Sequence, residues 1–103
     1  MAITCFIRYT LDPFKVSSFE QYAQQWLVTI PECGGNLLGY FMPHEGTNNI
    51  AMALVSFDSL ASYEAYRTRL RTSADAVANF EFAKREQFIL SEERAFLRNV
   101  ESA

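Results

Sequence analysis

The stretch that decides the fold is NLLGYFMPHEGTNNIAMALVSF, residues 36–57. Two short apolar runs, residues 36–43 and 49–57, flank the polar segment HEGTN, a pattern typical of two β-strands joined by a turn. Gly46 is the turn residue that we expect to adopt a positive φ, because glycine does so without steric cost. The stretch therefore predicts an antiparallel hairpin.

Both predicted strands are apolar on both faces. In the first, Leu37, Gly39 and Phe41 alternate with Leu38, Tyr40 and Met42, and in the second Ile50, Met52 and Leu54 alternate with Ala51, Ala53, Val55 and Phe57. If helices cover only one face, about six sizeable apolar side chains remain on the other, each worth ~1.5–3 kcal/mol if buried. The sum, on the order of 10 kcal/mol, rivals the whole stability of a small domain. A second copy of the same sheet is the simplest cover, so the sequence predicts a homodimer.

The rest of the chain supplies helices and two outer strands. Residues 2–10 are rich in β-branched and aromatic types and predict a strand. An S-x-x-E capping box at Ser17 then precedes an amphipathic helix that Pro31 and Gly34-Gly35 should end. The apolar stripe of this helix comprises Phe19, Tyr22, Ala23, Trp26, Leu27 and Ile30.

A second helix should follow, capped by Asp58 or Ser59, then a third over residues 74–88 and a final strand over residues 93–100. Val77, Phe80 and Lys84 are expected on one side of the third helix. The order β-α-β-β-α-α-β predicts an α+β ferredoxin-like fold with a four-stranded antiparallel sheet, in a single domain spanning residues 1–103.

Composition excludes several classes of protein. A net charge of −3 and the scattered Arg67, Arg69 and Arg71 argue against nucleic acid as a partner. No apolar run approaches the ~20 residues of a membrane span, and no secretion signal is present, so we expect a cytoplasmic protein with reduced cysteines. One histidine and no C-x-x-C predict no metal site, and we expect no cofactor.

The segments LLGYFMPHEGTNNIAMALVSFDSLASYEAYRTRLR, ANFEFAKRE and ILSEERAFLR resemble the NIPSNAP family of dimeric α/β-barrel proteins. The resemblance covers essentially the whole chain, and PHEGTN followed by ASYEAYR is its most specific part. It implies a ferredoxin-like protomer that pairs face to face into a barrel. The wider superfamily includes cofactor-free monooxygenases, haem-degrading enzymes and isomerases, but the resemblance implies no established reaction.

A pocket in such a fold would lie between the helix layer and the concave sheet. The side chains that we expect to line it are Trp26, Tyr22, Tyr40, Met42, Tyr63 and Arg67, with Tyr9, Phe19 and His44 as further candidates. Each has a structural alternative: the aromatic residues sit at core spacing, and Arg67 could extend to solvent or pair with Glu64 or Glu86.

His44 has two interpretations. An imidazole titrates near pH 6.5, so His44 could act as a general base in a pocket. Alternatively, it shapes the hairpin turn by hydrogen bonding to backbone groups of residues 46–49. Two functions therefore stay open. One is a dimeric barrel that binds a small apolar molecule or mediates protein contacts. The other is a cofactor-independent monooxygenase or isomerase that acts on an aromatic or lactone-like substrate.

Overall fold

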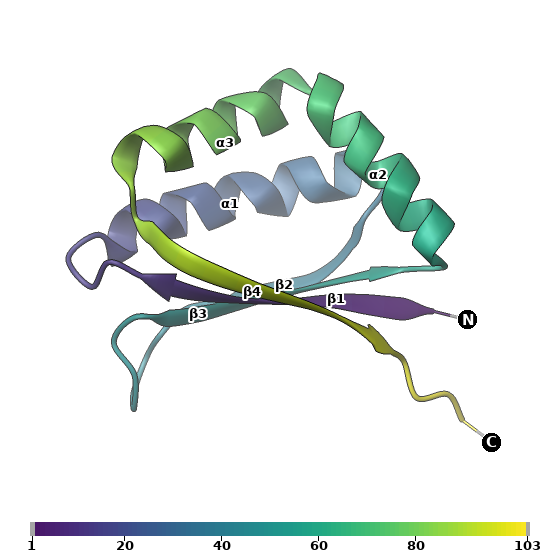
Figure 1. The fold of residues 1–103 in the computed structure, drawn as a ribbon, viewed down its shortest axis with the longest axis horizontal. Helices are drawn as coiled ribbons and strands as arrows, with labels where there is room; N and C mark the ends of the chain where they lie inside the picture. The colour runs from purple at the N-terminus through teal and green to yellow at the C-terminus, as the bar shows by residue number, and fades with distance from the viewer. Residues whose placement is uncertain (1, 103) are drawn as a thin grey trace.

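The computed structural model describes residues 2–102 and confirms the predicted element order. Three helices cover one face of a four-stranded antiparallel sheet with strand order β2-β3-β1-β4, and the opposite face carries no helix (Figure 1). The elements are β1 (Ile3–Leu11), α1 (Val16–Glu32), β2 (Asn36–Phe41), β3 (Ile50–Phe57), α2 (Leu60–Thr72), α3 (Ala74–Glu86) and β4 (Ile89–Arg98). This is the ferredoxin-like arrangement.

The apolar stripe of α1 is confirmed except at Leu27, which is 51% exposed, and the predicted ends of the helix are wrong. Phe19, Trp26 and Ile30 are buried against the sheet as expected. The helix begins at Val16 because a turn closed by the bond from Lys15 N to Asp12 O, at 2.9 Å, already directs the chain into it. Ser17 consequently lies in the first turn and makes no capping bond. At the other end, the helix continues through Pro31 to Glu32.

A β-bulge in β2 overturns the predicted alternation of that strand. The register with β3 shifts between Leu37 and Gly39, so Leu38 is an extra residue that opposes none on its neighbour. Because side chains alternate between the two faces of a sheet, one added residue moves every side chain beyond it to the opposite face. Leu37 therefore shares the helix-covered face with Tyr40, whereas Leu38 and Phe41 are more than half exposed on the outer face.

The uncovered outer face of the sheet is apolar, as the sequence predicted. On β3 the predicted alternation is confirmed: Ala51 and Ala53 are buried under the helices, while Met52 lies on the outer face and is 37% exposed. Strand pairing places further outward residues next to Met52. We call the following set the outer apolar patch: Phe6, Leu38, Phe41, Met52, Leu54 and Leu97.

The two shorter helices meet at one residue. Ser59 caps α2, accepting a hydrogen bond from Ser62 N at 3.2 Å, which confirms one of the two predicted caps. Ser73 ends α2 and caps α3, accepting from Ala76 N at 3.2 Å. Serine suits both caps because its hydroxyl accepts a bond from the helix N-terminus.

The residues that α3 buries are a small side chain and an amide, Ala76 and Asn79. The small alanine lets α3 and α1 approach closely, and Asn79 Nδ2 donates a hydrogen bond to Tyr22 O at 2.9 Å. Val77, Phe80 and Lys84, which we expected on one side of this helix, are exposed or half-exposed, and the Phe80 ring contacts Trp26 of α1 at a centroid distance of 5.0 Å.

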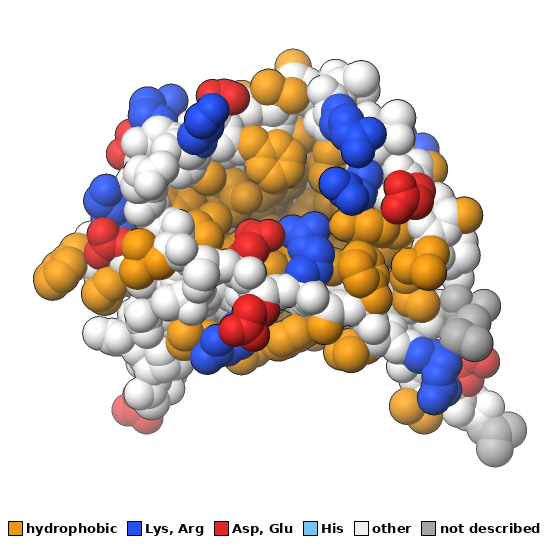
Figure 2. Space-filling model, viewed as in Figure 1, with side chains coloured by type: hydrophobic (Ala, Val, Ile, Leu, Met, Phe, Trp, Pro, Cys, Tyr) orange, Lys and Arg blue, Asp and Glu red, His pale blue; other side chains and the backbone are white. Residues whose placement is uncertain are grey.

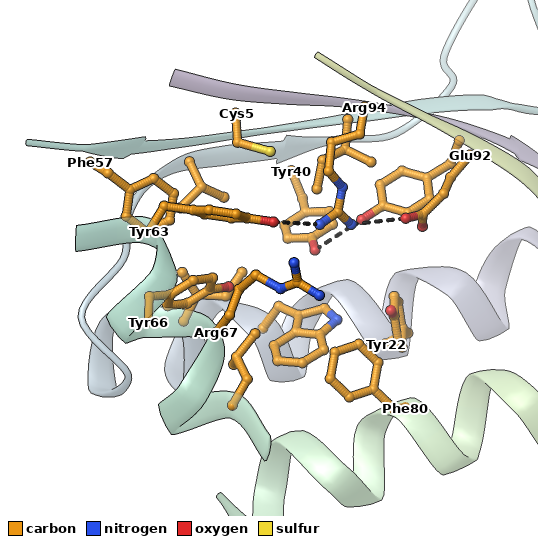
Figure 3. Close-up of a pocket in the computed structure, with 16 residues that line it drawn as sticks. Cys5, Tyr22, Tyr40, Phe57, Tyr63, Tyr66, Arg67, Phe80, Glu92 and Arg94 are labelled. Carbon is orange, nitrogen blue, oxygen red and sulfur yellow. Dashed lines mark hydrogen bonds and ion pairs between the residues drawn. The ribbon is translucent and has the colours of Figure 1, made fainter. Parts of the chain in front are cut away.

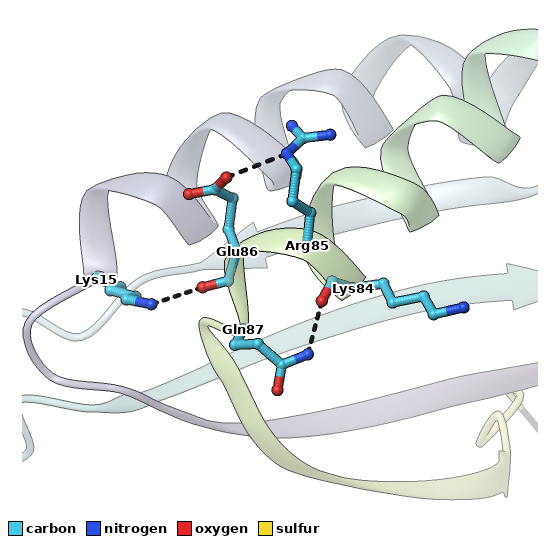
Figure 4. A network of polar contacts seen from close by, with 5 residues as sticks. All are labelled: Lys15, Lys84, Arg85, Glu86 and Gln87. Atoms are coloured by element: carbon cyan, nitrogen blue, oxygen red, sulfur yellow. Dashed lines mark hydrogen bonds and ion pairs between the residues drawn. The ribbon is translucent and has the colours of Figure 1, made fainter.

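The end of α3 is set by polar contacts that its sequence pattern does not reveal (Figure 4). Gln87 adopts a left-handed conformation with φ 57°, and its side chain donates to Lys84 O at 2.6 Å. Lys15 Nζ donates to Glu86 O at 2.7 Å, placing a cation at the negative end of the helix. The helix therefore ends at Glu86 rather than at Phe88, and β4 begins at Ile89, four residues before the predicted Glu93.

Candidate functional site

A cavity of about 380 Å³ lies between the helix layer and the inner face of the sheet. Its walls come from all four strands, from α1 and α2, and from Phe80 of α3. Figure 2 shows the opening of the cavity as a hollow with hydrophobic side chains inside and basic and acidic side chains around its mouth. The volume is in the range of small-molecule sites.

The cavity gathers the aromatic residues that carry a polar group. The chain has five tyrosines and one tryptophan, and all six line the cavity: Tyr9, Tyr22, Trp26, Tyr40, Tyr63 and Tyr66. Of the nine phenylalanines, only Phe57 and Phe80 line it. Tyrosine and tryptophan combine a large apolar surface with one hydrogen-bonding atom, which is the composition of a pocket for a planar organic molecule.

The strands and α1 position the inner part of this aromatic wall. Tyr9 on β1 and Tyr40 on β2 face the helices from the two strands that flank β3, and their hydroxyl oxygens are 3.3 Å apart. Tyr22 and Trp26 lie one turn apart on α1, with ring centroids at 5.7 Å in an edge-on arrangement. The Trp26 ring also contacts Phe80, 5.0 Å away, at the mouth.

Two arginines and one glutamate form the charged part of the mouth (Figure 3). Arg94 on β4 donates from Nη2 to Glu92 Oε1 at 2.8 Å and from Nη1 to the Tyr63 hydroxyl at 3.3 Å. Arg67 on α2 lies over the Tyr63 ring, 5.8 Å from its centroid. No carboxylate among the described residues forms an ion pair with Arg67, so its predicted pairing with Glu64 or Glu86 is not formed.

Burial raises the pKa values of four phenols in the cavity. It raises the pKa of Tyr22 to about 12, and it also raises the pKa values of Tyr9, Tyr40 and Tyr66 above their usual value. Although burial of Arg94 opposes its charge, the hydrogen bond to Tyr63 and the nearby carboxylate raise its pKa overall. At neutral pH these hydroxyls are therefore hydrogen-bonding groups and not bases.

Six of the nine predicted site residues come together in the cavity, and three lie elsewhere. Tyr22, Trp26, Tyr40, Tyr63 and Arg67 all line it, as does the further candidate Tyr9. Met42 packs against the edge of the core without lining the cavity, and the further candidate Phe19 is fully buried behind the wall.

His44 lies in the exposed loop between β2 and β3. It borders a shallow depression with Val16 and residues 43–48, separate from the cavity. The loop is fixed by Asn49, whose carbonyl accepts from Leu11 N at 2.8 Å, and Gly46 has the predicted positive φ of 93°. Among residues 2–102 no hydrogen bond of His44 is found, so neither its predicted base role nor its predicted turn bond gains support from the geometry.

The sequence prediction missed the contribution of β4. Glu92 and Arg94 face the cavity because they pair with Tyr9 and Ile7 of β1, which also face it. The signal was present as the alternation Glu92, Arg94, Phe96, but placing the strand start at Glu93 left Glu92 outside it. Cys5 and Tyr66 were also missed as lining residues. Burial raises the pKa of the Cys5 thiol.

Residues 2–102 contain neither a cluster of metal-binding side chains nor a membrane-spanning helix. No three His, Cys, Asp or Glu side chains come close enough together to hold a metal ion. No helix in this part of the chain has the length and apolar character needed to cross a membrane.

The sheet covered on one face by helices defines a ferredoxin-like α+β protein, and the cavity between its layers is of small-molecule size. The NIPSNAP family model matches residues 4–103, and the chain belongs to this family. No curated protein matches the sequence.

Solved structures of similar proteins share the fold. A NIPSNAP family protein with unknown function from Agrobacterium tumefaciens has a TM-score of 0.84 and 16% identity, covering 99% of this chain and 91% of that one. A second NIPSNAP family protein from the same organism has a TM-score of 0.83 and 19% identity, covering 97% and 94%. An uncharacterized NIPSNAP domain protein from Burkholderia xenovorans has a TM-score of 0.76 and 22% identity, covering 95% and 94%.

Proposed function

We propose that this NIPSNAP protein is a homodimer whose cavities each bind a small, planar, largely apolar molecule. The observation that carries the proposal is the gathering of all five tyrosines and the only tryptophan around one cavity. A core built only for packing has no need to concentrate its hydroxyl-bearing aromatics in this way, because each buried hydroxyl requires a partner. Tyrosine rings give a planar ligand flat apolar surfaces with hydrogen-bonding groups at their ends.

The homodimer is supported by the outer apolar patch. Its six side chains lie together on the face without helices, and Leu38 and Phe41 are more than half exposed. At about 1.5–3 kcal/mol per buried side chain, covering the patch would stabilise an assembly by several kcal/mol. A second copy presents the same flat apolar surface, so a two-fold contact between sheets would close the barrel.

The geometry favours binding over chemistry. The polar groups in the cavity are phenols kept protonated by burial, together with arginines and one glutamate already paired with Arg94. His44, the base required by the monooxygenase or isomerase alternative, lies outside the cavity. The proposed ligand site therefore consists of Tyr22, Trp26, Tyr40, Tyr63 and Arg67, with Arg94 added.

Isothermal titration calorimetry with 2-naphthamide, a planar uncharged probe, tests the ligand site. We expect one molecule bound per chain, and we expect Leu70→Phe to abolish binding, since Leu70 lines the cavity and the larger ring would occupy it. Leu60→Phe is the matched control, because Leu60 is exposed on the same helix away from the cavity. Binding that is absent, or that persists unchanged in Leu70→Phe, would refute the proposed site.

A further inference from the structure

We infer that the cavity selects an aromatic anion, a planar ring system bearing a carboxylate or a group of similar charge, and that Arg67 and Arg94 bind that charge. This inference rests on the proposed ligand site and adds the charge of the ligand. It follows from the arrangement of cations, anions and hydroxyl groups at the mouth.

The two guanidinium groups enter the same space from opposite walls. Arg67 comes from α2 and Arg94 from β4, and both point into the cavity above the aromatic floor (Figure 3). Such a convergence of like charges is unfavourable unless an anion lies near both. Glu92 neutralises Arg94 at 2.8 Å, and no carboxylate among the described residues does the same for Arg67. The charged lining groups, two arginines and one glutamate, therefore leave one positive charge in a protein whose net charge is −3.

The neutral polar groups also suit an anion. The phenols of Tyr9, Tyr22, Tyr40 and Tyr66 are protonated at neutral pH, and the bond between Tyr9 and Tyr40 uses only one of the protons of that pair, so the cavity keeps hydroxyl protons for a ligand. The indole N–H of Trp26 is a donor only. The two arginines and the indole of the lining are hydrogen-bond donors only, and Glu92 is the one carboxylate acceptor in the lining. A ligand with a negative group at one end of a ring would meet donors at the mouth and aromatic faces beneath them.

The position of the charge sets the shape of the ligand. Tyr22, Trp26 and Phe80 provide the aromatic surface behind the mouth, and the arginines lie at the opening where the charge keeps contact with water. Arginine binds carboxylates through a planar pair of donors and also stacks on rings, as Arg67 does on Tyr63. A ligand with its carboxylate attached directly to a fused ring fits both requirements.

The test compares two probes with one ring and different charge, 2-naphthoate and 2-naphthamide, by isothermal titration calorimetry on the full chain. We expect naphthoate to bind about tenfold or more tightly, since a hydrogen bond to a charged group is worth ~1.5–3 kcal/mol and each 1.4 kcal/mol is tenfold. Arg67→Gln should weaken naphthoate binding about tenfold, Glu92→Gln should tighten it a few-fold, and both should change naphthamide affinity by less than about twofold. Arg71→Gln, on the exposed side of the same helix and away from the cavity, is the control.

The outcomes separate the two proposals. If both probes bind equally, or if Arg67→Gln leaves naphthoate affinity unchanged, the anion inference is overturned while the cavity remains a ligand site. If neither probe binds, the proposed function fails and the inference fails with it. Preserved far-ultraviolet circular dichroism in each variant excludes misfolding as the cause of a loss.

Discussion

The two faces of the β2–β3 hairpin are both apolar in sequence and differ in what covers them. On β3 the inner face carries the small Ala51 and Ala53 beneath the helices, and the outer face carries the larger Met52 and Leu54. The small inner residues leave room for tyrosines from neighbouring strands, and the large outer ones form a continuous surface. Apolar content alone does not distinguish a face that encloses a cavity from a face that no helix covers, whereas side-chain size and hydroxyl groups do.

The largest expected effect comes from placing a charge on the outer face. Leu54→Glu should cause unfolding or aggregation rather than a clean monomer, because a buried unpaired carboxylate costs several kcal/mol in an interface. Light scattering should give twice the 11.8 kDa chain mass, or a multiple of it, for the parent protein. Leu27→Glu, at a half-exposed leucine on α1, is the control and should leave the mass unchanged. A parent protein that is a stable monomer would show that the outer apolar patch needs no second copy to cover it.

The aromatic residues that α1 packs against the inner face should differ in how much each stabilises the fold. Phe19→Ala removes a ring that is 0% exposed and packed on all sides, so we expect a loss of ~3–5 kcal/mol in the free energy of unfolding. Trp26→Ala should cost less despite the larger ring, because one side of Trp26 faces the cavity and forms fewer contacts there. Urea denaturation measures both values. Equal or reversed losses would show that Trp26 belongs to the filled core.

Alkaline pH should destabilise the protein through the cavity, which all five tyrosines line. The pKa of Tyr22 rises from 10.0 to about 12 on folding, so its contribution is complete below pH 10 and is lost as the pH rises towards 12. The linkage amounts to up to about 3 kcal/mol at 1.36 kcal/mol per pKa unit. Urea unfolding at pH 8, 10 and 11 should show this decline, with a shallower slope in Tyr22→Phe. A slope that Tyr22→Phe does not alter would contradict the burial of this phenol.

The smallest effect is expected from a polar pair on the outer face. Arg8 Nη1 lies 3.6 Å from Glu93 Oε1, and the two side chains are 39% and 75% exposed. Such a pair is worth ~0–1 kcal/mol when solvated, so Arg8→Gln should change the free energy of unfolding, measured by urea denaturation, by about 0.5 kcal/mol or less. A loss that grows with protein concentration would indicate that the Arg8–Glu93 pair lies within a contact between two copies, and it would distinguish the outer face from the inner one more clearly.

The sequence was sufficient for the strand order, the buried stripe of α1 and the double apolar character of the hairpin, since each depends on a simple periodicity. It was insufficient where one extra residue shifts the alternation of a strand, as the bulge at Leu38 does in β2. It also failed where a polar contact ends an element, as Gln87 does after α3. Six cavity residues were identifiable as aromatic or basic residues on inward faces. Glu92 and Arg94 required the register between β4 and β1, which composition does not encode.

The pairing of β1 with β4 has a consequence for the order in which the molecule is made. β1 is central in the sheet, yet one of its neighbours is the last strand to be synthesised, and the Thr4 hydroxyl donates to Asn99 Oδ1 across 95 positions. Contacts so distant along the chain slow folding, because a long loop must close before they contribute. During translation the nascent chain would have an open sheet edge at β1 until β4 leaves the ribosome. The mouth of the cavity, which β4 completes, would be the last part of the protein to form.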